Sequence, residues 1–226
     1  MLVLEIEDIK KLIDKIGFKD YFLKLITTIE EDYKAWSDFD KMPRIATHVD
    51  GGVIELMPIS NEYQYTFKYV NGHPKNPKTS NKLTVMATGQ LSVVETGEPL
   101  MFTEMTLLTA LRTAATSALA AKYLAKKDSK ILAMIGNGAQ SEFQYLVFSY
   151  LFDIQELRYF DVDDGAMDKM AANLFKYGVK LTPCESTEEA IENADIITTV
   201  TADKKYQTIL TEEMIKKDVF INALGG

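Results

Sequence analysis

Ile131-Leu-Ala-Met-Ile-Gly-Asn-Gly-Ala-Gln-Ser141 is the stretch that indicates the fold most clearly, because an apolar, strand-like run breaks there into two glycines. A second strand-like run, residues 155–160, follows and ends at Asp161. A buried strand that turns sharply into a helix leaves unpaired backbone N–H groups and a positive dipole end at the turn. Because such a turn attracts phosphate groups, the pattern predicts a dinucleotide-binding unit of the Rossmann type.

The two glycines fit this interpretation, although the motif is incomplete. Gly136 would make the tight turn, and Gly138 would let the backbone approach the phosphates. Ser141 stands where the six-residue fingerprint expects a third glycine, so an ordinary turn whose glycines serve packing stays an alternative. Asp161 lies 25 residues after Gly136, near the usual spacing of the acid that binds the adenosine ribose. Its carboxylate would repel a 2′-phosphate, which favours NAD over NADP.

Strands and helices alternate from residue 129 onward, which predicts a parallel sheet with right-handed crossovers. The last strand leads to Gly225 and Gly226 at the carboxyl edge of the sheet, where α/β proteins bind ligands. Because the chain stops where a loop should begin, we expect it to be a fragment of a longer protein. The expected strands are 130–135, 156–160, 179–182, 195–200 and 218–223, and the expected helices are 139–152, 165–177 and 187–193.

The first half of the chain has a different pattern. Residues 8–37 predict two helices, the first ending near Gly17, and helical spacing places Trp36 in the core or at an interface. The period then changes to two, which predicts a sheet, and one long helix over 106–127 follows. We therefore expect an α/β protein with an α+β domain of residues 1–118 and a Rossmann domain of residues 119–226. The strands expected in the first domain are 53–57, 63–70, 83–94 and 100–102, with a loop at 71–81.

Composition narrows the class of partner. The 226 residues are 46% hydrophobic, enough for a sizeable core, and the net charge of −8 argues against nucleic acid or an anionic membrane as the partner. A small molecule is favoured instead. Cys184 is the only cysteine, which is consistent with a reducing cytoplasm. His48 and His73 lack metal-ligand spacing, so we expect no metal site, and we find neither a membrane span nor a signal peptide.

Six segments in order carry a family resemblance. They are Arg44-Ile-Ala-Thr-His48, Val53-Ile-Glu-Leu-Met-Pro58, Phe67-Lys-Tyr-Val-Asn-Gly-His-Pro74, Thr109-Ala-Leu-Arg-Thr-Ala-Ala-Thr-Ser117, Ile135-Gly-Asn-Gly-Ala-Gln-Ser-Glu-Phe143 and Asp195-Ile-Ile-Thr-Thr-Val-Thr-Ala-Asp203. Together they resemble the ornithine cyclodeaminase and mu-crystallin family over essentially the whole chain. The segments around residues 55–58 and 71–74 look most like the bacterial ornithine cyclodeaminases.

This resemblance implies a fold and an activity. The fold is an N-terminal α+β domain that binds substrate and forms a homodimer, followed by an NAD-binding Rossmann domain. The implied activity is that of an ammonia-lyase, which converts L-ornithine to L-proline and ammonia. Hydride passes from the substrate Cα to NAD, the resulting imine cyclises with loss of ammonia, and the hydride returns. A location in the cytoplasm fits this chemistry.

The resemblance also assigns roles in the substrate site. Arg44, Lys68 and Arg112 match positions that hold the amino acid, together with Met57, and two guanidinium groups suit a carboxylate. Lys68 also interrupts an aromatic and apolar strand, where a charge is costly unless it faces a partner or ligand. Glu55 would face the reacting carbon and help to position a proton or a water. By pattern alone, each of these cations would more often be a surface or salt-bridge residue, and Glu55 could equally face solvent.

Cofactor contacts follow from the same match. In the family, an aspartate directly after the glycine pair acts as general acid and base, and this chain ends at Gly226 before it. We therefore expect the chain by itself to be inactive. The implied cofactor contacts are Thr84, Arg112, Gly136, Gly138, Ala139, Gln140, Asp161, Thr201, Ala223, Leu224, Gly225 and Gly226.

Two other kinds of function fit the same scaffold. One is an NAD-dependent amino-acid dehydrogenase or a ketimine reductase, which would show net production or consumption of NADH. The other is a protein that binds NAD(H) without catalysis.

Overall fold

The protein consists of two compact units, Met1–Arg112 and Thr113–Gly226. The computed structural model describes residues 1–201 and 208–224. The division between the units falls inside helix α4 (Thr106–Leu124), which corresponds to the long helix expected from the sequence. Among the described helices, none has the length and apolar character needed to cross a membrane.

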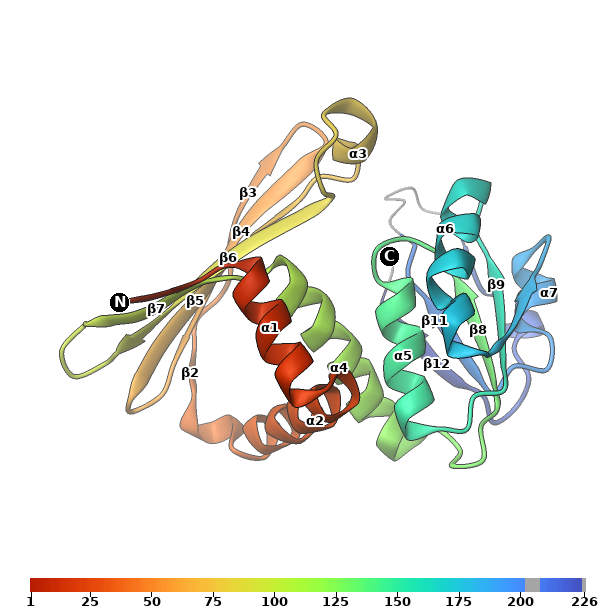
Figure 1. Ribbon diagram of the computed structural model, residues 1–226, viewed down its shortest axis with the longest axis horizontal. Helices are drawn as coiled ribbons and strands as arrows, with labels where there is room; N and C mark the ends of the chain where they lie inside the picture. Colours follow the sequence, from red (N-terminus) through yellow and green to blue (C-terminus); the bar gives the residue numbers. More distant parts are fainter. Residues whose placement is uncertain (202–207, 225–226) are drawn as a thin grey trace. The chain divides into compact units, whose positions relative to one another are not determined.

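The first unit is built on a seven-stranded sheet with the order β1-β7-β6-β5-β4-β2, in which β3 also pairs with β4 (Figure 1). Neighbouring strands are antiparallel except β1 and β7, which are parallel. The strands are β1 (Leu2–Leu4), β2 (Asp40–Lys41), β3 (Ile45–Val49), β4 (Gly52–Ser60), β5 (Gln64–Gly72), β6 (Val85–Val93) and β7 (Pro99–Glu104).

Two helices precede the larger strands of this unit. α1 (Ile6–Ile16) and α2 (Phe18–Lys34) meet at Gly17, whose φ of +88° is left-handed and suits glycine. They lie together on one side of the sheet (Figure 1). Their buried residues recur at helical spacing, which is the pattern that predicted them: Ile9, Ile13, Phe22 and Ile26.

Two local expectations in this unit are corrected. Trp36 lies in the short 3-10 turn η1 (Trp36–Asp38) and is 54% exposed, so the expectation of a core position is wrong, while an interface position stays a prediction. Its ring stacks on Tyr33 instead, with 5.7 Å between the ring centroids. The expected loop at 71–81 also contains one helical turn, α3 (Asn76–Thr79), which Pro77 can start because proline suits the first turn of a helix.

The second unit is a five-stranded sheet with the order β10-β9-β8-β11-β12, and every pair of strands is parallel. This is the doubly wound arrangement that the alternating pattern predicted. The elements are β8 (Ile131–Ile135), α5 (Ser141–Leu151), β9 (Glu156–Phe160), α6 (Asp164–Leu174), η2 (Phe175–Tyr177), β10 (Lys180–Pro183), α7 (Thr187–Ile191), β11 (Ile196–Thr199), η3 (Glu212–Met214) and β12 (Phe220–Ala223).

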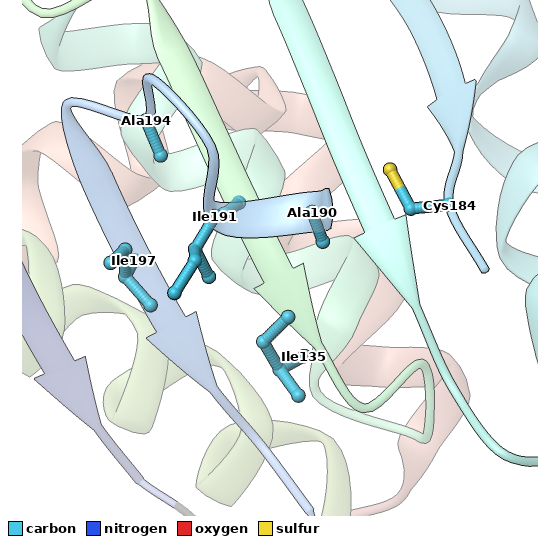
Figure 2. Close-up of a cluster of buried hydrophobic side chains, with 7 residues drawn as sticks. Ile135, Cys184, Ala190, Ile191, Ala194 and Ile197 are labelled. Carbon is cyan, nitrogen blue, oxygen red and sulfur yellow. The ribbon is translucent and has the colours of Figure 1, made fainter. Parts of the chain in front are cut away.

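Helices cover both faces of this parallel sheet. Ala190 and Ile191 of α7 pack with Ile135 and Ile197 in an apolar cluster (Figure 2). Thr198 is the neighbour of Ile197 on β11 and therefore faces the opposite side, where α5 lies. Because the chain moves outward from β8 through β9 to β10 and then crosses over to β11, the switch point of the fold lies at the carboxyl ends of β8 and β11.

Candidate functional site

Strand pairing in the first unit places three predicted substrate residues on one face of the sheet. Glu55 and Met57 are alternate residues of β4, so they share a face. Lys68 of β5 lies directly opposite Met57, and opposed residues of antiparallel strands project to the same side. Ala46 of β3 lies opposite Glu55, which brings the start of β3 to the same place.

Arg44 joins this face through an ion pair. Its Nη1 donates to Oε1 of Glu55 at 2.9 Å, where the arginine side chain is 61% exposed and the glutamate side chain 18%. Burial, and then the charges of Arg112 and Arg44, lower the pKa of Lys68 to about 8, while Glu55 acts in the opposite direction. Arg44, Glu55, Lys68 and Arg112 therefore form one group of interacting charges, called here the four-charge cluster.

The start of α4 is fixed to the sheet, and Arg112 is held through it. The N–H of Met105 donates to the carbonyl of Ala87 at 2.9 Å, and Thr106 Oγ1 accepts from the N–H of Ala87 at 3.0 Å. The Glu104 carboxylate accepts from the N–H groups of Thr106 and Leu107. A carboxylate at a helix start satisfies donors that the helix leaves unpaired. The sequence analysis missed Glu104, because glutamate is not among the residue types that usually cap a helix start.

The glycine turn of the second unit follows β8 directly. Gly136 has φ +91°, and a Cβ at this position would lie 2.9 Å from the backbone nitrogen of Thr201 and from the carbonyl carbon of Val200. Glycine is therefore required here both by backbone conformation and by close approach of another segment. A Cβ on Gly138 would meet no described atom within 4 Å, so open space adjoins this part of the turn.

Asp161 lies beside the turn, as its spacing predicted. Its Oδ2 accepts a hydrogen bond of 2.6 Å from the N–H of Asn137, and its Oδ1 accepts one of 3.0 Å from the N–H of Asp163. The carboxylate at the end of β9 is thus held at the glycine turn by backbone donors. Its role towards a ribose stays a prediction.

Ser141 explains how the turn closes without a third glycine. Its side chain is fully buried, and its Oγ donates to the carbonyl of Gly138 at 2.7 Å. The backbone N–H of Ser141 donates to the same carbonyl at 3.3 Å, so both donors of Ser141 hold the turn closed and the departure from the fingerprint is accommodated locally.

Several buried polar atoms around the turn have no partner among the described residues. They are both amide atoms of Asn137, the Oε1 atom of Gln140 and the Oγ1 atom of Thr201. Burying a polar group without a hydrogen bond is unfavourable, so these atoms suit a site that receives a polar ligand. Ala139 joins Gly138 to Gln140 in the same turn. Asn137 was not predicted, because nothing in its sequence context distinguishes it from a spacer between two glycines.

The remaining predicted cofactor residues are placed separately. Ala223 ends β12, and Leu224 follows with its N–H donating to the carbonyl of Thr199 at 2.9 Å. Gly225 and Gly226 lie outside the described residues. Thr84 belongs to the first unit, immediately before β6, and its carbonyl accepts from the N–H of His73 at 2.8 Å. Arg112 also belongs to the first unit.

A lysine that the sequence did not reveal also reaches the turn. Lys169 of α6 places its Nζ 3.4 Å from the carbonyl oxygen of Gly138 and 3.1 Å from Oε1 of Glu142. This contact joins elements that are distant in the sequence, so no local pattern indicates it. Within 1–201 and 208–224, no group of three His, Cys, Asp or Glu side chains is arranged to hold a metal ion.

Comparison with known proteins gives close relatives. The chain is 52% identical over 223 residues to an ornithine cyclodeaminase of Agrobacterium fabrum, a match that covers 99% of this chain and 63% of that protein. This chain thus spans less than two thirds of that relative's length.

Solved structures agree with this relationship. A Δ1-pyrroline-2-carboxylate reductase of Thermococcus litoralis, solved with NADH and L-proline, superimposes with a TM-score of 0.87 at 30% identity, covering 100% of this chain and 69% of that one. A lysine cyclodeaminase, studied for its recognition of L-lysine, L-ornithine and L-2,4-diaminobutyric acid, gives 0.91 at 27% identity, covering 100% and 67%. The model of the ornithine cyclodeaminase/mu-crystallin family matches residues 7–226, and the chain belongs to that family.

Proposed function

We propose that this protein acts as an ornithine cyclodeaminase, an ammonia-lyase that converts L-ornithine to L-proline and ammonia. The observation that carries the proposal is the 52% identity with the Agrobacterium enzyme, which extends over nearly the whole chain. The four-charge cluster supports it, because a group of cations around one carboxylate suits an amino acid that bears a negative carboxylate and positive amines.

NAD is the cofactor proposed for the second unit. The open space beside Gly138, the carboxylate of Asp161 and the unpartnered polar atoms of Asn137, Gln140 and Thr201 fit a dinucleotide at the switch point. When bound, NAD would accept a hydride from the substrate and return it, which activates the substrate carbon without net oxidation. Further contacts with NAD are proposed for Thr84, Arg112, Ala139 and the segment from Ala223 onward.

The residues of the first unit are proposed to bind and orient the substrate. Arg44 and Arg112 would hold the carboxylate through paired N–H donors, and Met57 would provide an apolar wall beside them. Lys68 would stabilise developing negative charge. Because its pKa is lowered to about 8, its ammonium group could also give up and regain a proton near neutral pH. Glu55 would face the reacting carbon and help to position a proton or a water. Holding the carboxylate at two points fixes the carbon that reacts.

The same proposal includes a homodimer built by the first unit and a location in the cytoplasm. Every residue of strand β3 is exposed, and two of them, Ile45 and Val49, carry large apolar side chains. An exposed apolar edge strand of this kind is normally covered in the working protein.

The test of the proposed reaction is its stoichiometry. The full-length protein is incubated with L-ornithine and a trace of NAD, and proline, ammonia and NADH are quantified. The proposal predicts equal amounts of proline and ammonia, in large excess over the cofactor, without accumulation of NADH. Accumulation of NADH would indicate a dehydrogenase, and tight NADH binding without turnover would indicate a binding protein.

A further inference from the structure

The carboxylate of Glu55 already forms an ion pair with Arg44, one of the cations that are proposed to hold the substrate. Arg44 directly precedes β3, and its Nη1 lies 2.9 Å from Oε1 of Glu55 on the neighbouring strand β4. A substrate carboxylate that binds Arg44 must therefore share the guanidinium with Glu55 or replace it.

The geometry of this pair favours replacement. The recorded contact joins one guanidinium nitrogen to one carboxylate oxygen, whereas an incoming carboxylate can engage two N–H groups in parallel, which is the stronger arrangement. The arginine side chain is 61% exposed and so is accessible to a solute, and ion pairs with an exposed partner contribute little. Two carboxylates on one guanidinium would also repel each other.

We propose that Glu55 is an internal competitor for Arg44, which the substrate carboxylate displaces, so that Glu55 becomes available to the reacting groups only when the carboxylate is bound. This inference rests on the proposed function, because it assigns an order of events to the same site. Binding of an α-carboxylate to Arg44 would thereby release Glu55, the side chain proposed to help position a proton or a water.

The surroundings of Glu55 give the displaced carboxylate a place to go. The negative charge of Glu55 opposes the lowering of the Lys68 pKa, so the two groups interact. Lys68 lies on the neighbouring strand β5, opposite Met57. Movement from Arg44 towards Lys68 keeps Glu55 beside a cation. The displacement therefore exchanges one ionic partner for another and does not strand a half-buried charge.

The effect of Glu55→Gln on ligand affinity distinguishes a competing role of Glu55 from an orienting one. If Glu55 competes with the ligand, Glu55→Gln tightens the binding of an α-carboxylate; if Glu55 only orients Arg44, the same substitution weakens it. The probe is L-proline, titrated into full-length protein saturated with NADH. We expect binding about two- to fivefold tighter in Glu55→Gln, corresponding to an ion pair with an exposed partner. In turnover, KM and kcat for L-ornithine should both fall.

Glu156→Gln is the matched control. Glu156 pairs with Lys180 at 3.0 Å, with side-chain exposures of 18% and 67%, close to those of the Glu55 pair, but it lies in the second unit. It should leave the affinity for L-proline unchanged. The gain in affinity for L-proline from Glu55→Gln should also disappear in an Arg44→Met background, because the guanidinium for which the two carboxylates compete is then absent.

Unchanged or weaker binding in Glu55→Gln overturns the inference, as does a gain that persists without Arg44. The titration is repeated with acetate, followed by NMR, so that a failure of the proposed function is recognised separately. If L-proline does not bind the wild-type protein but Glu55→Gln binds acetate more tightly, the proposed function is contradicted and the competition stands. If acetate shows no gain either, the competition is contradicted as well.

Discussion

Replacing Gly136 with alanine tests the geometry of the glycine turn. Gly136 has φ +91°, and its new Cβ would lie 2.9 Å from backbone atoms of Val200 and Thr201, which cannot rotate away as a side chain would. The left-handed conformation costs about 1–2 kcal/mol for a residue with a Cβ, and crowding adds about 1–3 kcal/mol. We therefore expect Gly136→Ala to lower the free energy of unfolding by about 2–5 kcal/mol, measured by urea denaturation followed by circular dichroism.

Two other glycines of the same unit separate the causes. Gly178 has φ +72° and no described atom within 4 Å of a Cβ, so Gly178→Ala should show the conformational cost alone, about 1–2 kcal/mol. Gly138 has neither a left-handed φ nor a close neighbour, so Gly138→Ala should change the unfolding free energy by less than about 0.5 kcal/mol. It should nevertheless weaken NADH binding, measured by fluorescence. A Gly136→Ala variant as stable as Gly138→Ala would show that neither backbone conformation nor crowding requires glycine at position 136.

Three further predictions concern charge and buried polar contacts. Asp161→Asn should weaken NADH binding about tenfold and reduce the preference for NADH over NADPH in fluorescence titrations, since a charged hydrogen bond contributes about 1.5–3 kcal/mol; an unchanged preference would contradict the ribose role. Binding of L-proline should weaken as pH rises through about 8, where Lys68 loses its proton, and Lys68→Arg should abolish this fall because arginine stays charged; a flat wild-type profile would exclude Lys68 from the site. Asn222→Ala should cost about 1–3 kcal/mol in thermal or urea unfolding, because Asn222 is buried and donates to Gln144 at 3.2 Å, whereas the more exposed Ile221→Ala should cost less.

The second unit could be predicted largely from the sequence because its information is local. Each strand–turn–helix step appears as a change of hydrophobic period, and the parallel order follows from the crossovers. The approach of Asp161 to the glycine turn followed from spacing alone. The approach of Thr201 to Gly136 did not, because it depends on how the residues after β11 pass the turn.

The first unit was predicted less completely, for a physical reason. All five residues of β3 are exposed, so no buried alternation indicates this strand. β1 has three residues and pairs with β7, about a hundred positions away in the chain. Both strands depend on pairing that is not local and that a single sequence does not reveal.

The residues of the four-charge cluster were predicted, but the interactions between them were not. The resemblance named Arg44, Glu55, Lys68 and Arg112, and the two arginines among them indicated recognition of a carboxylate. The ion pair between Arg44 and Glu55 was not expected, because it follows from the β3–β4 register. The lowered pKa of Lys68 likewise arises from burial and from the neighbouring arginines, which only the folded chain brings together.

In the proposed reaction, a hydride leaves the substrate Cα and later returns to the same carbon. The most direct measurement uses L-ornithine deuterated at Cα, with full-length protein and a trace of NAD, and locates the label by mass spectrometry and NMR. The proposed reaction predicts proline that retains deuterium at Cα, formed in equal amount with ammonia and without accumulation of NADH. Proline that has lost its deuterium, or deuterium that accumulates in NADH, would contradict it.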